Sequence, residues 1–288
     1  MGKREAPSGI DLDPTHDHIS IRGRRLALAD LVDRRLFDAN HLIALREQLV
    51  SAKPYPHLVV SGWFDVTLLQ LVHEEFDLYP EADLQPVHTK RESTYRSQAT
   101  RFGPATTLYF SIVNAGWFVE LLSALTGVAA LLPDPHLHGG GLHESREGGR
   151  FQIHRDFDRH PRTGLCNEMV LLTYLNRQWD PAWQGALELW DAASSRCVKT
   201  IQPEFGRTLL LPNSPISFHG HEAPLTPPAG RTRRSLGSYY YSNRFPLAEQ
   251  GHRPTIFLKH DHADRFQQVL KSLVPPLLWQ AIKRASKR

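Results

Sequence analysis

The feature that most constrains the fold is a series of short apolar runs between residues 136 and 243. Each run has the length of a β-strand, and turn-forming residues separate the runs. They read RFQIHRDF, MVLLTYLN, ALELWD, VKTIQP, RTLLLP, ISFHGH and RRSLGSYYYS. Several short strands at such spacing are typical of a β-sandwich or barrel. We therefore predict a mainly β fold whose core spans residues 136–245.

The flanking segments show helical rather than strand periodicity. Apolar residues recur at helical intervals in 26–52, 66–76, 116–127 and 263–284, and a short buried strand is expected in 57–64. Gly127 is placed to end one of these helices. We expect residues 1–135 to form helical support packed on the core and residues 246–288 to form a C-terminal helical extension, in one structural domain overall.

Two segments lack a clear apolar period. Residues 78–107 are polar and rich in turn formers, so we expect a long loop there, with the role of a lid over the site. Loops of a rigid scaffold commonly carry substrate specificity. We expect 78–107 and 157–167 to do so in this chain.

Composition excludes several classes of protein. The 288 residues are 41% hydrophobic, enough for a substantial core, and contain no apolar run long enough to span a membrane. The first twelve residues lack the apolar stretch of a secretory signal. The net charge of +4 is spread along the chain, so we expect no nucleic-acid partner.

The two cysteines, Cys166 and Cys197, form no CxxC pair and indicate a reducing, cytoplasmic location.

The run GRFQIHRDF offers the first half of a metal site. His154 and Asp156 are two residues apart in a strand-like segment, so their side chains point to the same face with Cα atoms about 6.6 Å apart. An imidazole and a carboxylate together provide a mixed nitrogen and oxygen ligand set, which suits iron. An HxD pair alone is a weak signal, since it also occurs as an ordinary surface pair.

The run ISFHGHEAPL supplies the other half. His219 would complete a set of two histidines and one carboxylate, the facial triad of non-haem iron oxygenases, which leaves three coordination positions open. His221 has the same strand parity, so alternation alone does not separate it from His219. Asp158 and His160 also compete, although Asp158 lies about 13 Å along the strand from His154.

A cluster of arginines follows in GRTRRSLGSYYY. Arg231, Arg233 and Ser235 share one face of a predicted strand, and Arg234 points to the other. A planar guanidinium binds a carboxylate through two parallel hydrogen bonds and stays charged. One of these arginines could therefore hold a dicarboxylate beside the metal.

The segment from His136 to Asn243 resembles the prolyl-4-hydroxylase-like branch of the Fe(II)/2-oxoglutarate-dependent dioxygenase superfamily, because its motifs occur in the same order along the chain. The resemblance rests on HRDF, LLTYLNRQWDPAWQGALELW, IQPEFGRTLLLP, FHGHEAPL and RRSLGSYYY, a little over a third of the chain. It implies a double-stranded β-helix, or jelly roll, with flanking N- and C-terminal helices. It also implies Fe(II) as cofactor and 2-oxoglutarate as cosubstrate, with ascorbate as a possible reductant.

The resemblance assigns roles residue by residue. It makes His154, Asp156 and His219 the metal ligands, because His219 opens a segment of the form H-x-x-x-x-P-[LV]. It places the 2-oxoglutarate-binding residues at Arg233, Ser235 and Tyr174, the first two in an R-x-S motif. Tyr174 could equally be an aromatic residue of the core.

The chain departs from the family pattern at one turn. The family often has Gly-Gly before the strand ALELW, whereas this chain has Gln184 and Gly185, a change expected to touch no ligand. Asp156 is intact, although halogenases of the superfamily carry a small residue there. Its presence favours hydroxylation or a related oxidation.

The expected activity is hydroxylation of an unactivated C–H bond in a small-molecule or amino-acid-type substrate, with release of succinate and CO2. Two alternatives stay open: a protein hydroxylase of the prolyl type acting on a peptidyl substrate, and a cupin-like metal-binding protein or isomerase without oxygenase activity. A cupin-like protein would have no need of the arginine at the R-x-S position.

Overall fold

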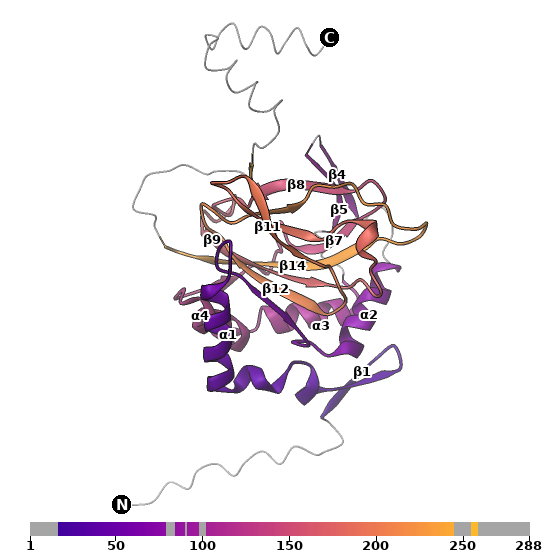
Figure 1. The fold of residues 1–288 in the computed structure, drawn as a ribbon. Coiled ribbons are helices and arrows are strands. Elements are labelled where there is room, and N and C mark those ends of the chain that lie inside the picture. The colour runs from indigo at the N-terminus through magenta and orange to yellow at the C-terminus, as the bar shows by residue number, and fades with distance from the viewer. Residues whose placement is uncertain (1–16, 79–83, 90, 98–101, 245–254, 259–288) are drawn as a thin grey trace, which may run out of the picture.

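One large antiparallel sheet dominates the computed structural model, which describes residues 17–78, 84–89, 91–97, 102–244 and 255–258. Its strand order is β11-β10-β13-β8-β5-β7-β14-β9-β12-β3, with β4 beside β5, β6 beside β14 and β15 beside β8. The sheet curls on itself, and the helices α1 to α4 gather along one side of it (Figure 1). The predicted jelly-roll fold is confirmed.

All seven strands predicted from the apolar runs are present. They are β8 (Arg150–Arg155), β9 (Cys166–Tyr174), β10 (Leu187–Asp191), β11 (Arg196–Ile201), β12 (Arg207–Pro212), β13 (Phe218–His221) and β14 (Arg233–Ser242). The remaining strands of the main sheet are β3 (Leu58–Ser61), β4 (Gln85–His88), β5 (Glu92–Ser97), β6 (Leu132–Pro133), β7 (Gly141–Ser145) and β15 (Ile256–Phe257). A separate hairpin near the N-terminus pairs β1 (His18–Ile21) with β2 (Arg24–Ala27).

The helices are α1 (Ala39–Ser51), α2 (Val66–Phe76), α3 (Pro104–Val113) and α4 (Gly116–Thr126), with short 3-10 turns at Leu28–Asp30, Arg34–Phe37 and Pro181–Trp183. Local sequence sets their ends. Asp65 caps α2 by accepting a hydrogen bond from the Leu68 amide at 2.7 Å. Gly127 ends α4 in the left-handed conformation, with φ 76°, as predicted.

Strand β9 shows why the core strands are apolar on both faces. Met169 and Leu171 pack in the cluster that includes the helices, whereas Val170 and Tyr174 belong to a second cluster formed largely by the other strands. Alternate residues of a strand point to opposite faces, so one strand contributes to two cores. The face that carries Tyr174 also borders the candidate site.

The expectation of a loop over 78–107 was wrong. Strands β4 and β5 lie in this segment, β5 is paired with both β7 and β8, and α3 begins at Pro104. Glu92 and Thr94 of β5 are buried although they are polar. No apolar alternation marks the strand, because its buried face lines a pocket instead of the core. A lid function for this segment stays a prediction.

The structure also bears on three expectations for the flanking segments. The helical periodicity of 26–52 corresponds to one helix, α1, which begins at Ala39 after two 3-10 turns. The N-terminal segment is also more than helical support, because it contributes β3, β4 and β5 to the main sheet. The predicted helix over 263–284 lies outside the described residues, and 246–288 contains the short strand β15. The division of the chain into support, core and extension stays a prediction.

No single helix in the described part of the chain is long and apolar enough to cross a membrane. Only α3 and α4 taken together, with a bend of 48° between them, reach the required length and composition.

Candidate active site

The three predicted metal ligands come together through strand pairing. His154 lies near the end of β8, Asp156 follows the strand directly, and His219 lies on β13. Antiparallel pairing of β8 with β13 makes His154 and His219 register partners. Gly220 supports this close approach, because a Cβ atom there would lie 2.7 Å from the Phe151 carbonyl oxygen.

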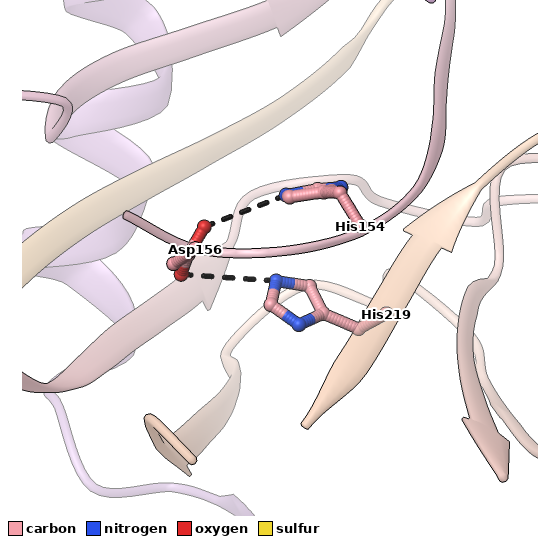
Figure 2. Close-up of side chains that lie close together, drawn as sticks. All are labelled: His154, Asp156 and His219. Atoms are coloured by element: carbon pink, nitrogen blue, oxygen red, sulfur yellow. Dashed lines mark ion pairs between the residues drawn. The ribbon is translucent and has the colours of Figure 1, made fainter. Parts of the chain in front are cut away.

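The side chains converge on one point. His154 Nε2 lies 3.4 Å from Asp156 Oδ1, and His219 Nε2 lies 3.9 Å from Asp156 Oδ2. Figure 2 shows both imidazole rings directed at the carboxylate from different strands. One ligand atom from each residue lies within 4.8 Å of the others, and all three residues are buried. The geometry can therefore hold one metal ion.

Hydrogen bonds on the other side of each ring set the histidine tautomers. His154 Nδ1 donates to the Gln152 carbonyl oxygen at 2.8 Å, and His219 Nδ1 donates to the Ser217 carbonyl oxygen at 3.0 Å. When a metal ion takes the place of any proton on Nε2, these bonds keep the other proton on Nδ1 and leave the Nε2 lone pair of each ring to the metal. The donor set of two neutral imidazoles and a carboxylate fits Fe(II).

Asp156 is held as a carboxylate. Burial alone would raise its pKa, but the hydrogen bond with His154 and the neighbouring imidazoles lower the pKa to about 2. The Tyr239 hydroxyl also hydrogen-bonds to Asp156. Burial beside this carboxylate in turn raises the pKa of Tyr239 well above its usual value. Asp156 is thus ionised and oriented at neutral pH.

A pocket lies at this group, and its walls come from strands β5, β7, β8, β9, β10, β13 and β14. We call it the inner pocket. It is lined by Glu92, Thr94, Arg96, His143, Ser145, Phe151, His154, Asp156, Val170, Leu172, Tyr174, Leu187, His219, Gly220, His221, Arg233, Ser235 and Tyr239. All six site residues predicted from the sequence are therefore brought to one cavity.

Arg233 is the buried cation of the inner pocket, with 6% of its surface exposed. Its Nε donates to the Gly185 carbonyl oxygen at 2.7 Å, and one Nη donates to the Tyr174 hydroxyl at 3.2 Å. Ser235 pairs with Tyr174 across β14 and β9. Among the described residues no carboxylate forms an ion pair with Arg233. A buried guanidinium of this kind calls for an anionic partner.

The turn before β10 contacts this arginine through Gly185, one residue after the position where the chain departs from the family pattern. The Gly185 carbonyl accepts the hydrogen bond from Arg233, and Gly185 has φ 82°. A Cβ atom at this position would lie 2.4 Å from Leu225 Cδ2 and 3.0 Å from Arg233 Cδ. Gln184, where the family often has glycine, has φ 64° and ψ −163°. This conformation strongly favours glycine.

The structure separates the residues that strand parity left open. Arg231 precedes β14, is exposed, and donates to the Arg177 carbonyl, outside the inner pocket. Arg234 points to the other face and pairs with Asp77 at 2.6 Å. His160 lies 3.6 Å from Asp134 through its Nε2, and its Nδ1 accepts backbone hydrogen bonds.

His221 also lines the inner pocket but does not join the metal group. It is buried, and its Nδ1 has no hydrogen-bond partner among the described residues. Burial and the nearby charge of Arg233 lower its pKa well below the usual value. A register irregularity between His219 and His221 shifts the pairing of β13 with β8 at this point.

Sequence reasoning missed several residues of the inner pocket. Tyr239 shares strand parity with Arg233 and Ser235, so alternation along β14 could have identified it. His143 and Ser145 lie on β7, a short strand whose GLHES sequence has little strand character. Burial, together with the charge of Arg96, lowers the pKa of His143 to about 3. Arg96 escaped notice because its strand was taken for a loop.

A buried His-Asp-His group inside a curled antiparallel sheet defines a jelly-roll protein with a two-histidine, one-carboxylate metal site. Residues 140–241 match the family model described as the 2OG-Fe(II) oxygenase superfamily. This segment is therefore of the 2OG-Fe(II) oxygenase type and indicates a dioxygenase, and its His-Asp-His group fits the Fe(II) that this family uses together with 2-oxoglutarate, as the sequence resemblance implied.

Solved structures with a similar fold include prolyl hydroxylases. The prolyl-4-hydroxylase of Pseudomonas putida is 17% identical, with a TM-score of 0.50 over 70% of this chain and 100% of that chain. A prolyl hydroxylase from Trichoplax adhaerens, in complex with a peptide fragment of the hypoxia inducible factor oxygen degradation domain, is 16% identical. Its TM-score is 0.52 over 74% of this chain and 95% of that chain. At this level of identity the likeness concerns the fold. No curated protein matches the chain.

Proposed function

We propose that the chain hydroxylates an unactivated C–H bond of a small-molecule or amino-acid-type substrate, using the inner pocket as its catalytic chamber. One observation carries the assignment: a buried arginine without a carboxylate partner in the described structure shares a cavity with a His-Asp-His group. A cupin-like binding protein or isomerase would need the metal group but not Arg233.

In this proposal His154, Asp156 and His219 hold the iron. When bound, Fe(II) supplies the activation of dioxygen that couples decarboxylation of 2-oxoglutarate, to succinate and CO2, with oxidation of the substrate. The chain sets the ligand geometry, through the two histidine–carbonyl hydrogen bonds and the Tyr239 contact to Asp156. An intact carboxylate ligand favours hydroxylation.

Arg233, Tyr174 and Ser235 bind the distal carboxylate of 2-oxoglutarate in this proposal. Two of the five N–H groups of Arg233 are used by Gly185 and Tyr174, so three remain for a carboxylate. The Tyr174 hydroxyl accepts from Arg233 and can donate its own proton to the same anion. Burial raises the pKa of this hydroxyl, although Arg233 opposes the shift, so it stays a donor at neutral pH.

The proposal is tested with purified protein, Fe(II), ascorbate and 2-oxoglutarate. Uncoupled turnover of 2-oxoglutarate yields succinate even without substrate, so we expect succinate to form with the unaltered protein and to be absent in His154→Ala. A substrate screen by mass spectrometry then looks for the gain of one oxygen atom in amino acids, their derivatives and proline-containing peptides. Oxygen gain only in the peptides would favour the alternative of a prolyl-type protein hydroxylase. Absence of succinate formation in every condition would contradict the oxygenase assignment.

A further inference from the structure

A third buried histidine of the inner pocket, His221, lies outside the metal group. It follows His219 by two residues on β13, so both side chains take the same face of the strand. The residue lines the cavity, and its Nδ1 is buried without a hydrogen-bond partner among the described residues. Buried polar side-chain atoms nearly always have a partner, so this nitrogen calls for an explanation.

The two metal-binding histidines show what His221 lacks. In His154 and His219, Nδ1 donates a hydrogen bond to the carbonyl oxygen of the residue two positions earlier. The described structure offers Nδ1 of His221 no such acceptor. A buried N–H without an acceptor is rarer than an unused lone pair, so the proton of the neutral ring lies on Nε2. The charged ring would carry a proton there as well, so this placement does not depend on ionisation.

Nε2 is also the ring nitrogen that a molecule in the cavity can reach, because Nδ1 is enclosed by protein. After burial, the charge of Arg233 is the main cause that lowers the pKa of His221, ahead of His154. The ring is therefore near the guanidinium. The hydrogen bonds of Arg233 go to Gly185 and Tyr174. The guanidinium and Nε2–H are both donors, so only an acceptor placed between them can satisfy both.

The acceptor follows from the proposed function, on which this step rests. There the distal carboxylate of 2-oxoglutarate lies at Arg233, with Tyr174 and Ser235 beside it. A carboxylate has two oxygens with about four lone-pair sites, enough for one more donor. His221 and the metal ligand His219 are about 6.6 Å apart along β13, a span comparable to the length of a five-carbon dicarboxylate.

We propose that His221 is a further binding residue for 2-oxoglutarate and donates a hydrogen bond from Nε2 to its distal carboxylate. Strand β13 then holds both ends of the cosubstrate, through the iron at His219 and through His221. The contact is charge-assisted and therefore stronger than one between neutral groups. It also favours 2-oxoglutarate over a 2-oxo acid with an apolar end, because the apolar acid leaves the buried donor unpaired.

The experiment titrates 2-oxoglutarate anaerobically into the Fe(II)-loaded protein and follows the visible charge-transfer band. His221→Leu removes the donor and should weaken 2-oxoglutarate binding by about 10- to 100-fold, the effect of one hydrogen bond to a charged group. His221→Gln should retain much of the affinity, because its amide nitrogen can take the place of Nε2. His221→Asn, whose amide lies nearer the place of Nδ1, should bind more weakly than His221→Gln. These two polar variants differ by one methylene group, so their comparison holds even where the leucine variant fails to fold.

A second ligand locates the contact on the cosubstrate. 2-Oxovalerate has the same chain length and the same oxo acid group as 2-oxoglutarate, but a methyl group replaces the distal carboxylate. Titrated to high concentration, it should bind His221→Leu nearly as well as it binds the unaltered protein. A loss confined to 2-oxoglutarate supports the proposed contact.

His73→Leu is the matched control. His73 lies on α2, does not line the inner pocket, and also has a buried Nδ1 without a partner among the described residues. Its replacement should leave the affinity for both acids unchanged.

Three outcomes would overturn the proposal while the charge-transfer band still forms and the proposed function stands. They are an unchanged affinity for 2-oxoglutarate in His221→Leu, an equal loss for both acids, and binding by His221→Gln no better than by His221→Asn. The second would move the contact to the oxo acid end, and the third would show that the shape of the side chain matters rather than its donor. Absence of the band in the unaltered protein would contradict the proposed function, and this inference with it.

Discussion

His154 and His219 face each other as register partners on β8 and β13, with ring centroids 4.7 Å apart. Strand pairing, rather than proximity in sequence, thus brings the two imidazoles together. Asp156 lies beside both imidazoles because it comes two residues after His154 in the same chain segment. The whole metal group depends on the pairing of two strands, which makes its geometry rigid.

The first prediction distinguishes the two histidines of β13. His219→Ala should abolish the charge-transfer band formed by Fe(II) and 2-oxoglutarate, because it removes one of three metal ligands. His221→Ala should retain the band, since His221 lies outside the group that converges on Asp156. Anaerobic visible spectroscopy measures both variants. Loss of the band in His221→Ala together with its survival in His219→Ala would reverse the assignment.

The second prediction concerns the cosubstrate. Arg233→Ala should raise the 2-oxoglutarate requirement by roughly 30- to 1,000-fold, the effect of losing about 2–4 kcal/mol of charge-assisted contact in a shielded pocket. Iron binding should survive, because no metal ligand is removed. Arg233→Lys should rescue only part of the loss, since it restores the charge but not the planar fork. Succinate formation is followed as 2-oxoglutarate is titrated.

Arg231→Ala is the matched control for this prediction. Arg231 is exposed, lies over the Trp183 ring and donates to the Arg177 carbonyl, so its loss should leave the 2-oxoglutarate requirement nearly unchanged. An unchanged requirement in Arg233→Ala would refute the assignment, and a large increase in Arg231→Ala would move the role to that residue.

The third prediction concerns the turn that supports Arg233. Gly185→Ala should raise the 2-oxoglutarate requirement, because the added Cβ would lie 2.4 Å from Leu225 Cδ2 and 3.0 Å from Arg233 Cδ. Gly230→Ala is the control: its φ is also positive, at 77°, but a Cβ there meets no atom within 4 Å. Both variants should lose stability, and only Gly185→Ala should alter the titration with 2-oxoglutarate. An equal effect of both variants would show that backbone strain alone is responsible.

The fourth prediction is that Gln184→Gly stabilises the protein. Gln184 is exposed and adopts φ 64° and ψ −163°, a conformation that costs a non-glycine residue about 1–3 kcal/mol. After the loss of unfolded-state entropy, a gain of about 1 kcal/mol in the free energy of unfolding should remain. Urea denaturation measures it. The same change at Gln48, in the exposed middle of α1, should destabilise the protein by about 1 kcal/mol.

The fifth prediction is an acid sensitivity caused by His143. Burial, aided by the charge of Arg96, lowers the pKa of this imidazole to about 3, whereas it titrates near 6.5 in the unfolded chain. Between these values the unfolded state binds more protons, so stability is lost as the pH falls. The loss approaches 1.4 kcal/mol per pH unit. His143→Gln should lower the slope of the free energy of unfolding against pH between 6 and 4 by about this amount, and parallel slopes would contradict the prediction.

The sequence by itself determined the elements whose side chains follow a simple period. The seven core strands, α2 and α4 were all predictable, because their apolar residues recur at the spacing of a strand or a helix. The pair His154 and Asp156 was also predictable, since ligands two residues apart on a strand share a face. His219, Arg233, Ser235 and Tyr174 were located through motifs in a fixed order along the chain.

Only the tertiary structure decided which residues surround these motifs. Strand β5 carries polar residues on its buried face because that face lines the pocket. Its sequence therefore has no apolar alternation from which the strand could be predicted. His219 and His221 have the same parity, and only their positions relative to Asp156 separate them. Phe257 reaches His154 through the pairing of β15 with β8, a contact between segments about a hundred residues apart. Local sequence encodes which face a side chain takes, whereas strand pairing over long distances determines which faces meet.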